Sequence, residues 1–359
     1  MKVAMISRSS LFTSKGGDTI QVQQTAKHLK ELNVSVEIRL AKEKINYEKY
    51  DLLHFFNLTR PADILRHIEK SATPFAVTPL FIDYSEFDQH FRKGISGKIF
   101  RHLSAGQIEY FKKIARFFKG QETVISFSYL KNGHHKSIKA IIDKAAMLLP
   151  NSQMEYEKLV QAYSLKPSYA VIRNGIDERL FITTVNEQKD PNLILCVARI
   201  EGLKNQINLI SALNDSKYQL YLIGDAAINQ NDYYLRCKKI AAPNIHFIDH
   251  LPQEELVRFY QKAKVHVLPS WFETCGLSTL EAAAMGCNIV ITNRGYTSEY
   301  YDGHAFYCDP SSPSSILKAV EKASNEDHEK NFREKIATDY TWRNAALKTY
   351  QAYQKILKK

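Results

Sequence analysis

Short apolar runs alternate with longer segments of helical periodicity along most of the chain. Such runs, bounded by turn residues, are typical of buried parallel strands, and apolar residues spaced three or four apart are typical of helices. In the first half this pattern predicts strands at 2–6, 34–40, 52–56, 75–77, 147–150 and 169–172. In the second half it predicts strands at 193–197, 219–223, 245–248, 265–268, 288–292 and 305–307. Strands alternating with helices in this way predict two α/β domains with parallel sheets.

The length of 359 residues also suits about two domains. We expect a first domain at 1–175 and a second at 190–340, joined by a polar linker at 183–191. The last segment, about 341–359, predicts one amphipathic helix. Its apolar side chains recur at steps of four and three, at Trp342, Ala346, Tyr350, Tyr353 and Leu357.

The most informative stretch follows the strand at 265–268. A polar loop segment at 270–274, here called the crest, leads into a predicted helix at 277–285. Glu273 lies on the crest and Glu281 inside the helix. Eight helical residues span about 12 Å, which suits one elongated ligand. Between the glutamates, the amides of Gly276 and Leu277 start the helix. Unpaired amides at a helix N-terminus favour an anionic group such as a phosphate.

A purely structural interpretation of the same residues stays open. Ser278 and Glu281 fit a capping box, in which the glutamate only satisfies a backbone N–H. Glu273 could equally be a solvated loop carboxylate. Spacing alone does not decide between a ligand site and these structural roles.

The same stretch resembles the retaining glycosyltransferases of family 4. Their signature is two glutamates separated by seven residues, and here Gly276-Leu277 lies between the pair and Glu281-Ala-Ala-Ala-Met-Gly286 follows. The resemblance implies the GT-B fold: two Rossmann-like domains facing a central cleft, with the C-terminal helix crossing back to the first. It also implies that Glu281 holds the nucleotide ribose and that Glu273 lies beside the donor sugar. Cys275 departs from the aromatic residue that the family often carries there.

Loops at other predicted strand ends supply further candidate ligand-binding residues. Arg199 and Lys204 follow the strand at 193–197, and open α/β sheets bind ligands at such carboxyl ends. The resemblance implies that both side chains hold the donor diphosphate. His250 follows the strand at 245–248, where the family reads the base with its backbone.

Two candidates lie in the first domain. Gly16-Gly17 precedes the helix after the first strand, and such a pair is either a turn or, as the resemblance implies, a loop facing the donor phosphates and the acceptor. Many family members carry a histidine near the strand that precedes residue 83. This sequence has none there, so Asp83 or Tyr84 is the candidate replacement.

A basic stretch at 92–144 holds twelve Lys or Arg against three acids, an excess of nine positive charges. Aromatic residues interleave with Lys112, Lys113, Arg116 and Lys119, as in a helix that binds an anionic membrane surface or an acidic acceptor. The alternative is an ordinary surface helix with its aromatics in the core. The net charge of +11 also favours anionic partners.

Several classes of protein are disfavoured by what the sequence lacks. No GxGxxG or GxxxxGK[ST] occurs, which argues against an NAD-dependent oxidoreductase. Five cysteines without a CxxC pair predict reduced core thiols in a cytoplasmic protein and no structural zinc. No apolar run approaches a membrane span or a signal peptide. No DxD triplet occurs, and since the family needs no metal, we expect neither metal nor cofactor.

Together these features predict a retaining glycosyltransferase of cell-surface polysaccharide or glycoconjugate synthesis. It would move a sugar from a nucleotide-sugar donor to a glycan or lipid-linked acceptor, in the cytoplasm or peripherally on the inner face of the membrane. One alternative is a sugar-nucleotide epimerase on the same fold. Another is a basic nucleic-acid-binding protein, although no recognised nucleic-acid motif occurs and we expect no nucleic-acid partner.

Overall fold

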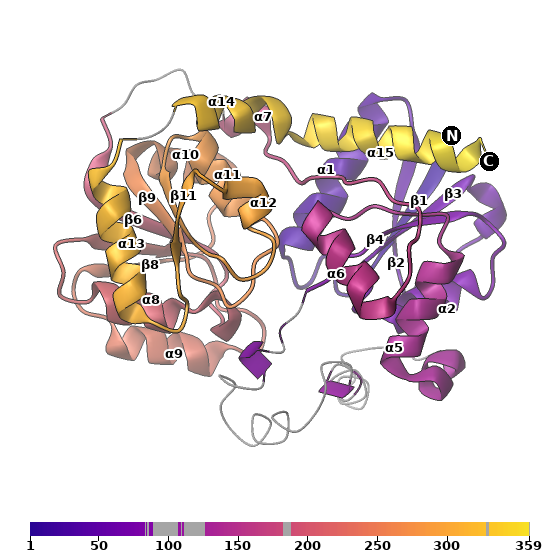
Figure 1. Cartoon of the computed structure of the whole chain (residues 1–359), viewed down its shortest axis with the longest axis horizontal. Coiled ribbons are helices and arrows are strands. Elements are labelled where there is room, and N and C mark those ends of the chain that lie inside the picture. Colours follow the sequence, from indigo (N-terminus) through magenta and orange to yellow (C-terminus); the bar gives the residue numbers. More distant parts are fainter. Residues whose placement is uncertain are drawn as a thin grey trace. The chain divides into compact units, whose positions relative to one another are not determined.

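The computed structural model describes residues 1–82, 84, 86–88, 107–108, 110, 126–181, 188–327 and 330–358. The chain divides into two compact units, which Figure 1 colours along the sequence. The first unit comprises Met1–Asn174 together with Trp342–Lys359, and the second comprises Gly175–Thr341. Each unit is built around one all-parallel sheet, so the predicted α/β class is confirmed.

The first unit has a five-stranded sheet in the order β2-β1-β3-β4-β5. Its strands are β1 (Lys2–Ser7), β2 (Ser35–Leu40), β3 (Leu52–Phe56), β4 (Phe75–Thr78) and β5 (Met147–Leu148). Every residue of β3 and β4 is buried, as expected for parallel strands whose two faces are both covered. The described helices are α1 (Gly17–Glu31), η1 (Tyr47–Lys49), α2 (Pro61–Ile68), α5 (Phe127–Lys144), α6 (Gln153–Tyr163) and α15 (Trp342–Leu357).

Helix α15 completes this unit from the far end of the sequence. It packs against α1 (Figure 1), and the Tyr353 hydroxyl lies 2.7 Å from Nδ1 of His54 on β3. His54 is buried, and its other ring nitrogen lies 2.9 Å from the Thr78 hydroxyl. The C-terminal helix therefore belongs to the core of the first unit, as the fold class implies.

The second unit has a six-stranded sheet in the order β11-β10-β9-β6-β7-β8. Its strands are β6 (Asp190–Val197), β7 (Gln219–Ile223), β8 (Ile245–Ile248), β9 (Ala263–Leu268), β10 (Asn288–Thr292) and β11 (Ala305–Cys308). Its first helices are α7 (Glu178–Phe181), η3 (Gly202–Lys204), α8 (Gln206–Leu213), α9 (Asn231–Ile240) and α10 (Gln253–Lys262). They are followed by α11 (Leu277–Ala284), α12 (Ser298–Tyr301), α13 (Pro313–Asn325) and α14 (Lys330–Asp339).

In each sheet the chain reverses its direction of winding at one pair of adjacent strands. That pair is β6 and β9 in the second unit, and β1 and β3 in the first. Loops that leave the carboxyl ends of such a pair diverge to opposite faces of the sheet and leave a crevice, where open α/β sheets bind ligands. In the second unit these loops are 198–205 after β6 and 269–276 after β9.

The strand predicted at 169–172 is wrong. Only Tyr169 pairs, with Leu148 of β5, although the Ala170 and Ile172 amides also donate to carbonyls of the 148–150 segment. A longer ladder would next need a donor at Pro150, and proline has no N–H. The segment therefore follows β5 without becoming a strand.

Two element boundaries and the buried face of one helix also differ from the predictions. The expected linker ends earlier, because Asp190 and Pro191 already belong to β6. Helix α1 already includes Gly17, which was expected to precede it, and is capped by Gly16. In α15 the buried stripe runs through Trp342, Ala345, Ala346, Thr349, Ala352, Tyr353 and Ile356, which leaves Leu357 exposed.

Candidate functional site in the second unit

Lys204 and Glu273 meet at the carboxyl ends of β6 and β9. The Lys204 ammonium donates to Oε1 of Glu273, and the Ser270 hydroxyl donates to the same oxygen at 2.8 Å. Glu273 is only 6% exposed, so its interpretation as a solvated loop carboxylate is wrong. A carboxylate this buried needs a partner of opposite charge, and Lys204 supplies it. The structure thus brings two predicted site residues together at the switch point of the sheet.

Backbone contacts hold the two loops that carry this pair. The Asn205 side-chain amide donates to the carbonyls of Pro269, at 3.0 Å, and Pro310, at 2.7 Å. The Trp271 amide donates to the Leu203 carbonyl at 2.9 Å. These contacts join the loop that carries Lys204 to the loop that carries Glu273. The position of the ion pair therefore depends on hydrogen bonds to the backbone as well as on charge.

The crest is also fixed from its other side, by the turn after β10. The Glu273 amide donates to the Arg294 carbonyl, and the Tyr296 amide donates to the Glu273 carbonyl at 2.9 Å. Gly295 lies between them with φ +100, and a Cβ there would come within 2.0 Å of the Glu273 carbonyl oxygen. Only glycine allows this close approach of two backbones.

Helix α11 starts beside the crest without a side-chain cap. Its N-cap is Gly276, at φ 66, and the Thr279 and Leu280 amides donate to the Gly276 carbonyl. In the part of the chain that the structure describes, the amides of Gly276 and Leu277 have no acceptor. These free donors and the positive end of the helix dipole make a position suited to a phosphate.

Glu281 does not close a capping box, so that interpretation is wrong. Its Oε1 accepts from the Gln253 side-chain amide at 2.7 Å, and its Oε2 accepts from the Tyr260 hydroxyl at 3.2 Å. Both partners belong to α10. Burial raises the pKa of Glu281 to about 7, against the smaller opposing effect of these two hydrogen bonds. A carboxylate has about four lone-pair positions, so capacity remains for two hydroxyl donors.

Arg199 and His250 lie on the same edge of the sheet but outside these contacts. The Arg199 guanidinium is 44% exposed and donates to Glu201 at 2.9 Å, so it is not joined to the Lys204–Glu273 pair. His250 is exposed, and its backbone amide donates to Asp225 at 2.9 Å. That bond links the loops that follow β7 and β8.

In the first unit, Gly16 and Gly17 end a loop that Arg8 organises. The Arg8 guanidinium donates to the Asp18 carboxylate, to the Ser10 carbonyl and hydroxyl, both at 2.9 Å, and to the Ser14 carbonyl at 2.6 Å. Arg8 is nearly buried, so this loop between β1 and α1 is held from the inside. Asp83 and the cluster Lys112, Lys113, Arg116 and Lys119 lie outside the described residues.

Sequence reasoning missed the residues that hold the site in place. In the second unit they are Gln253, Tyr260, Gly295 and Tyr301, and in the first unit Arg8 holds the loop that ends at Gly16 and Gly17. Gly295 had a usable signal, since it follows a buried strand in an Arg-Gly-Tyr turn. Each of the others makes at least one contact with a residue ten or more positions away in sequence, which no local pattern reveals.

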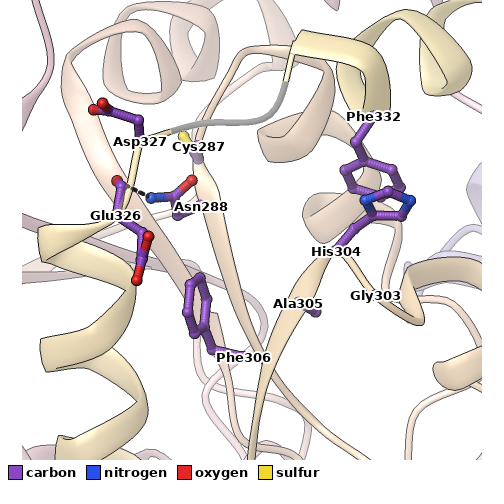
Figure 2. Close-up of a pocket in the computed structure, with 9 residues that line it drawn as sticks. All are labelled: Cys287, Asn288, Gly303, His304, Ala305, Phe306, Glu326, Asp327 and Phe332. Atoms are coloured by element: carbon purple, nitrogen blue, oxygen red, sulfur yellow. Dashed lines mark hydrogen bonds between the residues drawn. The ribbon is translucent and has the colours of Figure 1, made fainter.

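A cavity elsewhere in the second unit has a volume of about 280 Å³. Figure 2 shows the His304 and Phe332 rings stacked on one side of it and Asn288 donating to the Glu326 carbonyl on the other. Cys287 immediately precedes β10, Asn288 is its first residue, and Ala305 is the first residue of β11. The cavity therefore lies at the amino ends of these strands, on the edge of the sheet opposite the candidate site, and we do not assign the donor to it.

Two further observations apply to the described residues only. No group of three or more His, Cys, Asp or Glu side chains there could hold a metal ion. No helix within them is both long and apolar enough to cross a membrane.

Comparison with known proteins finds a family match within the second unit. Residues 178–339 match the family described as Glycosyl transferases group 1. The second unit therefore carries the domain of this glycosyltransferase family, and the resemblance noted in the sequence is confirmed. A glycogen synthase from Mycobacterium tuberculosis is 29% identical over 198 residues, which cover 51% of this chain and 47% of that protein. The chain thus spans about half the length of the curated glycogen synthases that it matches.

Solved structures extend the likeness to the whole chain. A sucrose-phosphate synthase from Thermosynechococcus elongatus superposes with a TM-score of 0.77 at 16% identity, covering 100% of this chain and 99% of that one. The Anabaena protein HepE, in complex with UDP-glucose, superposes with a TM-score of 0.64 at 15% identity, covering 100% and 98%. At such identities the likeness concerns the fold, which is GT-B.

Proposed function

We propose that this protein is a retaining glycosyltransferase that moves a sugar from a nucleotide-sugar donor to a glycan or lipid-linked acceptor. The observation that carries the proposal is the Lys204–Glu273 pair at the switch point, beside the uncapped start of α11. A diphosphate needs positive potential, a sugar needs oriented hydrogen-bond acceptors, and this edge of the sheet offers both. The glycosyltransferase domain found at residues 178–339 supports the same class of reaction.

Each residue has a role that its chemistry suits. Lys204, Arg199 and the amides of Gly276 and Leu277 would stabilise the negative charge on the departing nucleoside diphosphate. Glu273 would accept hydrogen bonds from the donor sugar, and Glu281 from the ribose hydroxyls. The loop around Asp225 and His250 would lie against the base, with backbone groups reading it.

The reaction replaces one bond to the anomeric carbon by another on the same face of the sugar. The bond to the diphosphate oxygen breaks, and its electron pair leaves with the nucleoside diphosphate. The acceptor hydroxyl forms the new bond and gives its proton to the departing diphosphate. Lys204 and the amides of α11 supply the charge stabilisation that this step needs, so we propose that no metal ion takes part.

A panel of UDP-, GDP-, ADP- and TDP-sugars tests the proposal. UDP-sugars come first, because HepE is seen with UDP-glucose. We expect at least one donor to release its nucleoside diphosphate, with a product anomer that matches the donor. Inversion at C2 without release of nucleotide would instead establish the epimerase. RNA binding without any response to the panel would establish a nucleic-acid-binding protein.

We also propose that the basic stretch at 92–144 binds an anionic membrane surface and so brings a lipid-linked acceptor within reach. The proposal rests on its excess of nine positive charges, each able to contribute about 1 kcal/mol near such a surface. Replacing Lys112, Lys113, Arg116 and Lys119 by Gln should release the protein from anionic vesicles at low salt. The matched control replaces four exposed cations of the second unit, Lys217, Arg236, Lys239 and Lys262. Equal release by both variants would show that only net charge matters.

A further inference from the structure

Tyr301, on the short helix α12, lies directly behind the start of α11. Its hydroxyl donates to the Cys275 carbonyl at 2.6 Å and lies 3.3 Å from the Gly276 carbonyl. The ring is fully buried, and it packs edge-on to Phe332 with centroids 6.2 Å apart. A buried hydroxyl this close to two successive carbonyls restricts the rotation of the peptide groups to which they belong.

Those peptide groups also contain the two amides with no acceptor. In a trans peptide the C=O and the following N–H point in opposite directions. The Cys275 carbonyl shares its peptide plane with the Gly276 amide, and the Gly276 carbonyl shares its plane with the Leu277 amide. Tyr301 holds the Cys275 carbonyl and, together with the Thr279 and Leu280 amides, the Gly276 carbonyl, so both N–H groups point to the side opposite these contacts.

The conformation of Gly276 makes this arrangement adjustable. Its φ of 66 is open to glycine at little cost, and a Cβ there would come within 2.9 Å of the Thr279 hydroxyl. The residue that permits the turn therefore does not fix it, since glycine has many alternative conformations. The first turn of α11 holds the Gly276 carbonyl through the Thr279 and Leu280 amides, and Tyr301 adds the contact from outside the turn that holds the Cys275 carbonyl.

We propose that Tyr301 is a positioning residue, whose hydroxyl aims the Gly276 and Leu277 amides at the diphosphate of the donor. The inference rests on the proposed function of this site. Tyr301 touches neither donor nor acceptor and acts only through the two peptide groups. Preorganised amides of this kind gain their effect by needing no reorientation when the charged group arrives.

The test compares Tyr301→Phe with Tyr218→Phe. Tyr218 is a matched control, because it is buried in the same unit and its hydroxyl has no hydrogen-bond partner among the described residues. Calorimetry with UDP, GDP and ADP, and with the corresponding nucleosides, separates the phosphates from the base and ribose. We expect Tyr301→Phe to weaken nucleoside diphosphate binding on the order of tenfold and to leave nucleoside binding unchanged. Tyr218→Phe should change neither.

Equal loss for nucleoside and nucleoside diphosphate, or no loss at all, would overturn the role of Tyr301. Failure of the wild type to bind any of the three diphosphates would instead overturn the proposed function. Should Tyr301→Phe fail to fold, wild-type protein labelled with [15N]glycine and [15N]leucine still tests the geometry. Inorganic pyrophosphate should then shift the Gly276 and Leu277 amide signals, and unmoved signals would refute the inference.

Discussion

Glu281 combines burial with a pKa near neutrality, so its charge should respond to pH. Its carboxyl has a pKa of about 7 in the folded protein, against 4.5 for an unperturbed glutamate. Between these values the folded state binds more protons than the unfolded state, so the free energy of unfolding falls as pH rises through this window. The loss should be on the order of 3 kcal/mol. Denaturant unfolding of the wild type and of Glu281→Gln from pH 4 to 8 measures it, and parallel curves would refute the prediction.

Nucleotide binding should lower the pKa of Glu281, which burial raises. Ribose hydroxyls donate to the ionised carboxylate better than to the protonated one, so a bound nucleotide should lower the pKa of Glu281. The protein should then release up to one proton per nucleotide near pH 7. Calorimetry in two buffers of different ionisation enthalpy detects this proton, and Glu281→Gln should release none. Proton release that persists in the variant would place the titrating group elsewhere.

The two basic side chains of the site should respond differently to removal. Lys204 neutralises Glu273, which is nearly buried, so Lys204→Met should lower both stability and turnover. Breaking a buried pair in this way costs about 3–5 kcal/mol. Arg199 is exposed and, among the described residues, is paired only with Glu201, so Arg199→Met should lower turnover and change stability by about 0.5 kcal/mol or less.

A double variant separates the two effects of Lys204. Adding Glu273→Gln to Lys204→Met removes the unpaired charge, so stability should recover while turnover stays low. Recovery of turnover as well would mean that Lys204 serves only to neutralise Glu273, and that the departing diphosphate is stabilised by other groups.

At the scale of elements, the loop between β1 and α1 should depend on one guanidinium. Arg8 makes five hydrogen bonds to the loop and to Asp18, and lysine cannot reproduce that fork. Arg8→Lys should therefore increase hydrogen exchange in residues 10–16, with no change in the second unit. Arg39→Lys is the control, because Arg39 pairs with Glu43 on an exposed part of the same unit. Unchanged exchange in Arg8→Lys would mean that the loop is held by other contacts.

Local pattern predicted most of the elements, and its failures have physical causes. Strand β3 was found to the residue because a parallel strand covered on both faces is almost entirely apolar. Strand β7 was also found to the residue, although its first residue, Gln219, is exposed. The prediction at 169–172 failed because strand pairing depends on a neighbour, and that neighbour carries Pro150. In α15 the predictions for Trp342, Ala346 and Tyr353 are confirmed, but Thr349 rather than Tyr350 and Ile356 rather than Leu357 are buried.

The same limit applies to the site. The sequence identified Lys204, Glu273, Gly276 and Glu281, because their spacing follows strand ends and a helix start. It could not choose between the ligand and structural interpretations of the glutamates, since both have the same spacing. Tertiary contacts with Ser270, Gln253 and Tyr260 exclude the solvated loop carboxylate and the capping box, and the ligand roles of the glutamates stay a prediction.

At the scale of the whole molecule, the first unit depends on α15. This helix follows most of that unit by 180 residues or more in the sequence. A chain that ends at Thr341 lacks α15 and so exposes α1 and removes the Tyr353 partner of buried His54. We expect the calorimetric transition of the first unit to disappear and that of the second to remain, with nucleoside diphosphate still bound. A chain that ends at Leu357 keeps the whole helix and is the control. Loss of both transitions in the shorter chain would show that the second unit cannot fold alone.

The return of α15 to the first unit reverses the order in which a ribosome can complete the two halves. Domains generally fold as units while synthesis proceeds, and the N-terminal one usually finishes first. Here residues 175–341 can emerge and fold while residues 1–174 still lack the helix that covers α1. The first unit is thus translated first but completes its folding last. The apolar surface that α15 covers must be kept from other contacts until translation has passed residue 356.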